Sequence, residues 1–462
     1  MSTSGSAPSY AIVGLGHRAS MYLEALLGPH AETGRLIALC DVNDGRLALA
    51  GESSRRAGLE PALFHSFDTL MEVARPERVI VTVPDHLHAD LIVRALEGGA
   101  DVITEKPITI DAACCARILE ARRRTGRRIT VGFNYRYSPV RTLLKQVLTS
   151  GIIGHVHGGV FEWLLDTYHG ADYFRRWHRQ KANSGGLFVH KATHHFDLLN
   201  WWLAGVPRRV SATGSRVFYR PEIADALGLG GHGPRCTGCP VFDRCGVRID
   251  LAGRPHLRAL YLENEAHDGY LRDRCVFDPA MDIEDSMHAT IEYAGGITIG
   301  YRLTAFSPAE GYRVVFDGTR GRVELTNVER AHVLPDGSLV DPPEEETNRI
   351  VVQPHFSRAY ELRMPEARGL HGGGDKVMLG ELFGSRPNDQ YGRVADERAG
   401  VLSAAVGIAA NASLAARAPV LLEDVIEDLP IPDYPQAPFG PDAIWQSFDP
   451  ARYSFLEGAR ML

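Results

Sequence analysis

Short apolar runs alternate with amphipathic stretches over residues 1–130. Between the runs, segments such as residues 88–99 show the apolar spacing of a surface helix. Strand-length runs separated by helices are typical of a parallel sheet with helices on both faces. The pattern therefore predicts a doubly wound α/β domain. The runs lie at 10–13, 36–41, 78–84, 101–104 and 128–134.

The second half of the chain shows longer alternating segments. Residues 287–306 predict a β-hairpin around Gly295 and Gly296, and residues 311–327 predict a second one. A run of small apolar residues at 399–416 predicts a helix packed closely on a sheet.

We divide the chain into three parts. Residues 1–130 form the first domain, residues 131–430 the second, and the Pro-rich residues 431–462 an extended tail that is expected to wrap a neighbouring subunit. Within the second domain, residues 221–280 are rich in Gly, Pro and Arg and lack a clean period. We expect an insertion there.

The composition is that of an ordinary soluble globular protein. The chain has 462 residues, of which 44% are hydrophobic and 23% charged, and its net charge is −7. Nothing indicates a basic surface for nucleic acid, and no apolar run reaches the roughly 18 residues of a membrane span. The N-terminus is polar and lacks a signal-peptide pattern. We expect a cytoplasmic protein with reduced cysteines.

The most specific motif follows the first apolar run. Gly14, Gly16 and Ala19 lead into a helical pattern, which is the arrangement of a dinucleotide-binding turn. The first glycine makes the turn, and the second lets the backbone approach a pyrophosphate. The next run ends at Asp41, which would bond the ribose hydroxyls and repel a 2′-phosphate. The motif predicts NAD, against the alternatives of a plain turn and an ordinary strand-ending aspartate.

Residues 184–203 place several titratable groups inside an apolar run. On a helix, His190, His194 and Asp197 would share one face. A metal site, a proton-transfer site and ordinary helix chemistry are the competing explanations. The histidine spacing is that of a zinc-binding helix, but Lys191 stands where the metalloprotease pattern has Glu. A cation beside zinc is unfavourable, so catalytic zinc is the least favoured explanation.

Four of the seven cysteines fall in the expected insertion. A Cys-x2-Cys pair with two further cysteines can bind zinc tetrahedrally, which would stabilise a segment with little core. We expect structural zinc, with an iron–sulfur cluster, a disulfide or free thiols as alternatives. Nearby His232 could replace one ligand. The candidate ligands are Cys236, Cys239, Cys245 and Cys275.

Six motifs lie in one order along most of the chain. They are Gly14-x-Gly16-x-x-Ala19, TVPDHLHAD at 82–90, EKPI at 105–108, GFNYRYSP at 132–139, the segment 185–202 and HGGGD at 371–375. Together they resemble the glucose–fructose oxidoreductase, inositol dehydrogenase and rhizopine catabolism (Gfo/Idh/MocA) family. The resemblance implies an N-terminal Rossmann domain and a C-terminal α/β domain with a large, mostly antiparallel open sheet. It also implies hydride transfer between a nicotinamide cofactor and a sugar or polyol, and a homo-oligomer, dimer or tetramer.

The resemblance assigns two catalytic groups. The family's Glu-Lys-Pro lysine, between nicotinamide and substrate, is Lys106 here, and the catalytic histidine falls on His194. Histidine suits proton removal from a hydroxyl, and a lysine can stabilise the alkoxide. Many members have Asp four residues before that histidine, whereas this chain has His190. Asp197 or another residue would then supply the carboxylate that pairs with His194. The role of base could also shift to Lys191 or His190.

Further contacts are expected around these groups. Asn134, Tyr135 and Arg136 follow the last strand of the first domain, where family members contact cofactor and substrate; loop anchoring is the alternative. His371 and Asp375 would be functional or a helix cap. The expected substrate contacts are His190, Lys191, Tyr135, Arg136 and Asp197. The expected cofactor contacts are Gly14, Gly16, His17, Arg18, Asp41, Pro84, His88, Glu105, Lys106 and Asn134.

These observations favour an NAD-dependent oxidoreductase acting on a hydroxyl of a sugar, sugar derivative, cyclitol or glycoside. A redox-neutral glycoside hydrolase, which uses NAD without net consumption, is a second hypothesis, and the missing aspartate before His194 keeps it open. A non-catalytic sensor of NAD or sugar is a third, and the presence of both Lys106 and His194 argues against it. The sequence leaves the substrate and the hydride face open.

Overall fold

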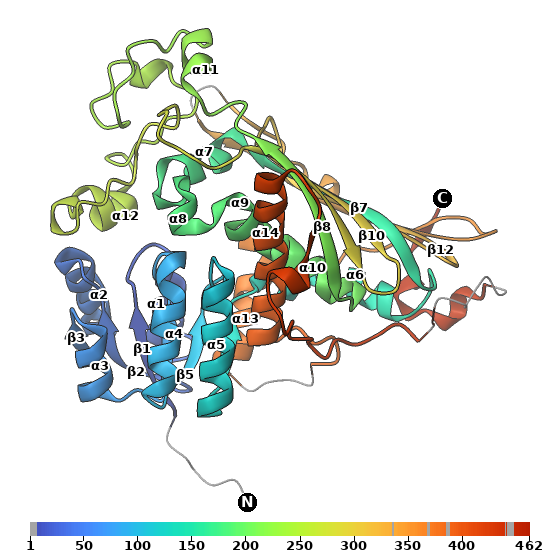
Figure 1. Cartoon of the computed structure of the whole chain (residues 1–462), viewed down its shortest axis with the longest axis horizontal. Helices are drawn as coiled ribbons and strands as arrows, with labels where there is room; N and C mark the ends of the chain where they lie inside the picture. The colour runs from blue at the N-terminus through green and yellow to red at the C-terminus, as the bar shows by residue number, and fades with distance from the viewer. Residues whose placement is uncertain (1–6, 335–336, 367–369, 385–388, 439, 441–447) are drawn as a thin grey trace, which may run out of the picture.

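The computed structural model describes residues 7–334, 337–366, 370–384, 389–438, 440 and 448–462. The chain forms two α/β domains, and a long insertion of the second domain reaches over the first (Figure 1).

The first domain is the predicted doubly wound fold. Its six strands are all parallel, in the order β3-β2-β1-β4-β5-β6. The sequence pattern missed β3, because it has only three residues and two of them are exposed. The strands are β1 (Ser9–Val13), β2 (Arg35–Cys40), β3 (Ala62–Phe64), β4 (Arg78–Val81), β5 (Asp101–Thr104) and β6 (Ile129–Val131). The helices are α1 (Ala19–Leu27), α2 (Asp44–Arg56), α3 (Phe67–Ala74), α4 (His88–Glu97) and α5 (Ala112–Thr125).

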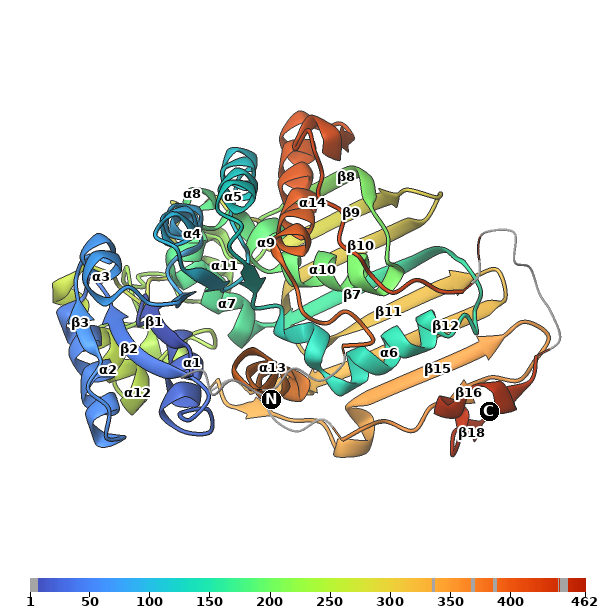
Figure 2. The same ribbon diagram turned by 90° about the horizontal axis from the view of Figure 1, so that it is seen from below.

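The second domain is built on a ten-stranded sheet in the order β17-β8-β9-β10-β7-β11-β12-β15-β16-β18. Among its described strand pairs only β7 and β10 run parallel, which confirms the expected mostly antiparallel sheet. Helices α6, α10 and α14 lie across one face of it (Figure 2). The strands are β7 (Val156–Asp166), β8 (Pro207–Ser215), β9 (Ser286–Tyr293), β10 (Thr298–Ser307), β11 (Glu310–Gly318), β12 (Gly321–Arg330), β15 (Asn348–Pro354), β16 (Tyr360–Glu361), β17 (Val420–Leu421) and β18 (Arg460–Met461), with β13 (His332–Val333) and β14 (Leu339–Val340) as a separate pair. The helices are α6 (Pro139–Thr149), α7 (Thr167–Arg175), α8 (Lys181–Ser184), α9 (Gly186–His190), α10 (Ala192–Leu203), α13 (Gly374–Phe383) and α14 (Glu397–Ala416).

Both predicted hairpins are present. β9 and β10 pair around Gly295 and Gly296, whose φ angles are +82° and +86°. Positive φ at both turn positions favours glycine, which explains the pair at this place. β11 and β12 form the second hairpin.

Helix α14 joins the two domains. A β-carbon on Gly407 would lie 2.3 Å from the Phe188 carbonyl oxygen, and one on Gly400 would lie 2.9 Å from Val131 Cγ2 in β6. Its small residues therefore allow the close packing that the sequence indicated. Among the described helices, only α14 is long and apolar enough to cross a membrane, and 67% of that stretch is buried inside the protein. It is a core helix of this fold.

The insertion lies between β8 and β9, over residues 216–285. Its helices α11 (Pro221–Ala226) and α12 (Pro255–Leu257) are short and joined by turns. From β8 it extends to the first domain, where α12 lies beside α2 (Figure 1). The described part of the tail packs on its own chain: Lys145 Nζ donates to the Pro435 carbonyl at 2.9 Å, and β18 pairs with β16. Wrapping of a neighbour stays a prediction.

Candidate active site

A cavity of about 1630 Å³ lies between the two domains, and the insertion covers part of it. Typical small-molecule pockets measure roughly 300–1,000 Å³, so this one has room for a dinucleotide and a substrate together. All ten expected cofactor contacts line it. Of the expected catalytic and substrate residues, Lys106, His190, Lys191, His194 and Tyr135 also line it.

The glycine loop fits a bound dinucleotide. Gly14 has a φ of +85°, and a β-carbon there would lie 2.7 Å from Val83 Cγ1. The turn against the end of β4 therefore requires glycine. A β-carbon on Gly16 would meet nothing closer than the Tyr261 hydroxyl, at 3.4 Å. Gly16 thus leaves space for a phosphate group at the N-terminus of α1.

Asp41 lies directly after β2, where a ribose contact requires it. Its carboxylate accepts hydrogen bonds from the Leu15 N–H at 2.6 Å and the Asn43 N–H at 2.8 Å. Arg46 Nη2 pairs with Asp41 Oδ1 at 3.1 Å. Arg46 comes from α2 and belongs to no motif, so sequence reasoning missed it. Its guanidinium holds the carboxylate in place and offsets part of its charge.

Lys106 lines the cavity from the turn after β5. The Lys106–Pro107 peptide is cis, and the Pro107 carbonyl oxygen lies 2.7 Å from His88 Nδ1. Burial lowers the pKa of Lys106 to about 8, although nearby carboxylates act in the opposite direction. Lys106 Nζ donates to the His190 carbonyl oxygen at 3.2 Å and lies 3.4 Å from His190 Nε2. The structure therefore places Lys106 against the residue that stands in for the family's aspartate.

The carboxylate of Asp85 pairs with His190, whereas Asp197, the expected partner of His194, pairs with Arg136. Asp85 Oδ2 lies 2.5 Å from His190 Nδ1, and both side chains are buried. Burial raises the pKa of Asp85 well above its usual value and lowers the pKa of His190 well below its own. The two groups therefore form a short, buried hydrogen bond beside Lys106. A signal existed in the sequence, because Asp85 closely follows β4 and the carboxyl ends of neighbouring parallel strands meet at one edge.

His194 and Lys191 are joined by Tyr135. The rings of His194 and Tyr135 stack with centroids 4.1 Å apart and an interplanar angle of 13°. Lys191 Nζ donates to the Tyr135 hydroxyl at 2.9 Å and lies 4.9 Å from the centre of the Trp163 ring. Burial raises the pKa of Tyr135 well above its usual value. The tyrosine is thus a neutral partner that fixes the distance between the two titratable groups.

Arg136 and Asp197 lie outside the cavity lining. Arg136 Nε and Nη2 bond the two Asp197 carboxylate oxygens at 2.7 and 2.5 Å, and both side chains are fully buried. His190 and His194 both line the cavity and Asp197 does not, so the three residues do not share one functional face as expected. They also lie on two helices, because α9 ends at His190 and α10 begins at Ala192. The geometry favours a structural ion pair over substrate contact for these two residues.

The segment that follows β7 contributes residues that sequence reasoning missed. His178 packs edge-on against His190 with ring centroids 4.1 Å apart, and burial lowers its pKa well below the usual value. His169 Nδ1 lies 2.6 Å from Glu310 Oε1, and its Nε2 lies 3.1 Å from the Tyr173 hydroxyl. His169, Tyr173 and His178 all line the cavity. No motif marks them, since they reach the site only through the packing of α7 and of the turn after it.

The HGGGD motif supports the turn that carries Asn134. Asp375 accepts a hydrogen bond from Asn134 Nδ2 at 2.6 Å. A β-carbon on Gly374 would lie 2.4 Å from the Asn134 carbonyl oxygen, so this approach requires glycine. Asp375 lies in the first turn of α13 and is not its cap, which corrects that expectation. The His371 side chain lies outside the described residues.

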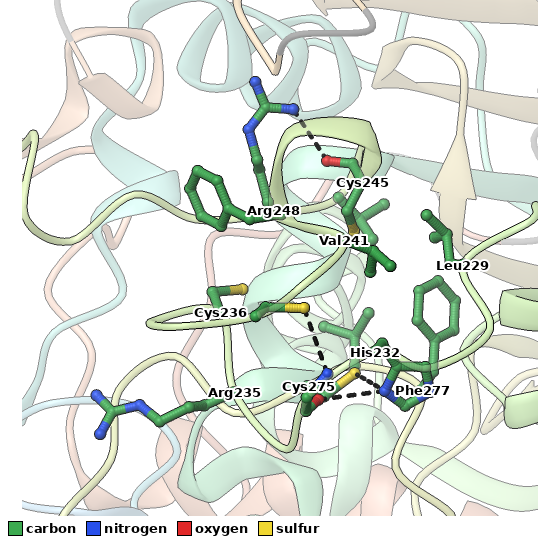
Figure 3. Close-up of a pocket in the computed structure, with 14 residues that line it drawn as sticks. Leu229, His232, Arg235, Cys236, Val241, Cys245, Arg248, Cys275 and Phe277 are labelled. Carbon is green, nitrogen blue, oxygen red and sulfur yellow. Dashed lines mark hydrogen bonds between the residues drawn. The ribbon is translucent and has the colours of Figure 1, made fainter.

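The four candidate zinc ligands line one small cavity of about 20 Å³ in the insertion, together with His232 (Figure 3). All four cysteines are free, so no disulfide joins them. Cys239 Sγ accepts from the Gly233 N–H at 3.4 Å, and Cys275 Sγ lies 3.4 Å from His232 Nδ1. Within the described ranges, no three His, Cys, Asp or Glu side chains are arranged to hold a metal ion. This arrangement of side chains therefore does not show the predicted zinc site.

Comparison with known proteins agrees with the fold and the motifs. The model of the oxidoreductase family's NAD-binding Rossmann fold matches residues 9–133, and the model of its C-terminal alpha/beta domain matches residues 145–422. Both belong to the Gfo/Idh/MocA family.

Individual relatives point the same way. The putative oxidoreductase YteT of Bacillus subtilis is 34% identical over 424 residues, which are 90% of this chain and 97% of that protein. Inositol 2-dehydrogenase of Salmonella typhimurium is 33% identical over 151 residues, 32% of this chain and 44% of that protein. The WlbA dehydrogenase of Bordetella pertussis, solved with NADH and UDP-GlcNAcA, shares the fold with a TM-score of 0.60 at 16% identity, over 90% of this chain and 98% of that one. The chain therefore belongs to the Gfo/Idh/MocA family and is an oxidoreductase with an NAD-binding Rossmann domain.

Proposed function

We propose that the protein is an NAD-dependent dehydrogenase that oxidises or reduces a hydroxyl-bearing carbon of a sugar, sugar derivative, cyclitol or glycoside. One observation carries the proposal: the glycine loop, the Lys106–His190–Asp85 group and the stacked His194 line the same cavity. The names of the relatives, inositol dehydrogenases and a dehydrogenase with a bound nucleotide sugar, support this substrate class.

The roles of the side chains follow from their positions. Residues 14–19 would hold the pyrophosphate and Asp41 the ribose. Bound NAD would supply the acceptor for the substrate's hydride. Lys106 would stabilise the charge on the reacting oxygen, and His194 would take the hydroxyl proton. His190 and Lys191 would orient the other hydroxyls, and Asp85 fixes the His190 ring for that purpose.

The two alternatives from the sequence are not favoured. The named relatives are dehydrogenases and oxidoreductases, and no observation in the described part of the chain favours glycoside cleavage or sensing. A panel of sugars, cyclitols and glycosides with NAD would test the proposal. Steady NADH formation with one class of substrate supports it, whereas substrate conversion without net NADH would favour the redox-neutral route.

The pKa of Lys106 predicts an alkaline limit to turnover. Because burial lowers this pKa to about 8, the cation that stabilises the alkoxide is present below pH 8 and is lost above it. We expect kcat/KM to fall as the pH rises through about 8, in both reaction directions. In Lys106→Arg this alkaline limb should disappear. An oxidation rate that instead rises through pH 8 would make Lys106 the base.

Asp41 should set the preference for NAD. Asp41→Ala removes the carboxylate that would meet a 2′-phosphate and leaves Arg46 with Asp268 as its remaining carboxylate partner, so the ratio of NAD to NADP affinities should drop by roughly tenfold or more. Asp44→Ala is the matched control, because this neighbouring carboxylate does not line the cavity. Native protein that binds NADP as tightly as NAD would refute the assignment.

We further propose that the insertion binds one zinc ion. The support is the Cys-x2-Cys-x5-Cys spacing, with Cys275 and His232 in the same small cavity; the thiols would have to turn towards a common point. Elemental analysis should find about one zinc per chain, and Cys239→Ser should lower it while Cys114→Ser, in the first domain, should not. Metal-free native protein, or iron with sulfide, would remove the proposal.

Two further expectations, a cytoplasmic location and a homo-oligomer formed through the outer face of the large sheet, also remain proposals. Sedimentation of the purified protein would test the oligomer.

A further inference from the structure

The insertion contacts the first domain at the end of the cavity that the glycine loop forms. Its residues 255–270 comprise α12 and the turns after it, and Figure 1 shows this segment against the first domain beside α2. Four of its side chains line the cavity: His256, Tyr261, Asp268 and Tyr270.

Tyr261 makes the central contact. Its hydroxyl accepts a hydrogen bond from the His17 backbone N–H at 2.9 Å. His17 belongs to the loop ahead of α1, where backbone N–H groups are the natural ligands of a pyrophosphate. A phosphate oxygen would take the same donor, and the released Tyr261 hydroxyl can then donate to that oxygen, since a phenol is both donor and acceptor.

A second set of contacts holds the segment on α2. Arg46 Nη2 lies 2.5 Å from Asp268 Oδ2, and Asn43 Nδ2 donates to the Asn264 carbonyl at 2.9 Å. A β-carbon on Gly45 would lie only 1.7 Å from Asn264 Oδ1, so the segment lies directly on the helix. These contacts join residues more than 200 positions apart in the sequence. They lie beside Asp41, with which Arg46 also forms an ion pair.

Cations gather at the same end of the cavity. Asp172 pairs with Arg176 at 3.3 Å, with Arg272 at 2.7 Å and with Arg175 at 3.7 Å, so three guanidinium groups share one carboxylate there. Burial, together with the charge of Arg176, lowers the pKa of His17 to about 4. The surroundings of Tyr261 are therefore suited to an anionic group.

We propose that residues 255–270 are a clasp that closes over the pyrophosphate of the bound dinucleotide, with Tyr261 as a direct phosphate contact. The proposal rests on the proposed NAD-dependent function. The dinucleotide leaves only when the clasp detaches from α1 and α2, so release is slow and the cofactor stays bound through the hydride step. The insertion is then part of the cofactor site, although it lies far from the Rossmann domain in the sequence.

The rate of NADH release from the full-length protein tests this. Preloaded NADH is displaced by excess NAD in a stopped-flow instrument, and its fluorescence is followed. Tyr261→Phe, which removes the phosphate contact, and Asp268→Asn, which weakens the hold on Arg46, should each speed release by about tenfold. Gly45→Leu should do the same by pushing Asn264 away, in a helix position that tolerates leucine. Glu263→Gln is the matched control, since Glu263 pairs with Arg258 on the exposed side of the segment.

The outcomes separate the clasp from the proposed function. If native protein binds NADH and all three variants release it at the native rate, the clasp is refuted and the dehydrogenase proposal stands. Slower release from Tyr261→Phe would also overturn it, because Tyr261 would then obstruct the cofactor. Native protein that binds neither NAD nor NADH would refute both proposals.

Discussion

His194→Ala should lower turnover by roughly 10²–10⁴-fold, the usual contribution of a general base. The affinity for NAD should change little, because we assign His194, which stacks on Tyr135, to the substrate hydroxyl. Steady-state kinetics with the identified substrate and a titration with NADH measure the two effects separately. His194→Gln, which keeps much of the stacking area, should be as slow as His194→Ala.

The neighbouring histidine provides the matched control. His195 is fully buried, bonds the Tyr301 hydroxyl at 2.7 Å and does not line the cavity. His195→Ala should therefore reduce the free energy of unfolding by about 1–3 kcal/mol, while the folded fraction keeps its turnover. If His194→Ala retains most of its turnover, the base is another group, and Lys191 is the first candidate. If His194→Ala only unfolds the protein, packing is its main role.

Lys106→Ala should lower turnover by about 10²–10³-fold, the cost of removing one group that stabilises a developing oxyanion. Since Lys106 also lowers the pKa of His190, after the larger effect of burial, its loss should raise that pKa. Kinetics and the NMR titration of the His190 ring measure these two consequences.

Lys181→Ala is the control for Lys106. Lys181 is a partly exposed lysine that pairs with Glu284 outside the cavity, at 2.5 Å. Its removal should leave turnover within a few-fold of the native value. Turnover in Lys106→Ala within tenfold of the native protein, together with an unchanged alkaline limb, would show that Lys106 does not contact the reacting oxygen.

The sequence alone predicted the parts of the site that depend on local backbone requirements. Gly14 and Gly16 are needed where a β-carbon would meet β4 or a phosphate, and Asp41 closes the next strand. Lys106 likewise lies just after the end of a strand, β5. These residues lie at strand ends, and the order of parallel strands brings them to one edge of the sheet.

Residues that reach the site through tertiary packing were not predictable in the same way. Asp85 pairs with a histidine 105 positions away, and His178, in the short turn after α7, meets His190 only in the folded chain. Arg136 and Asp197 fitted the pattern of a binding site but neutralise each other in the core. Charged residues in a sequence do not distinguish a binding site from a structural ion pair, because a buried charge needs a partner in either case.

The docking position of the insertion was also not predictable from the sequence. Its Gly-, Pro- and Arg-rich composition indicated irregular structure, but nothing in that pattern indicates where such a segment docks. The contacts of Tyr261 and Asp268 with α1 and α2 are specific side-chain contacts over long sequence separations. They appear only in the folded chain.

Transfer of a labelled hydride is the most direct test of the central claim. The protein, NAD and a panel of sugars and cyclitols deuterated at their ring carbons are incubated together, and the mass of the NADH formed is measured. We predict NADH that carries one deuterium from a member of this panel, and far slower formation of it with His194→Ala. Conversion of a substrate without deuterium appearing in NADH, or no transfer from any member, would contradict the account.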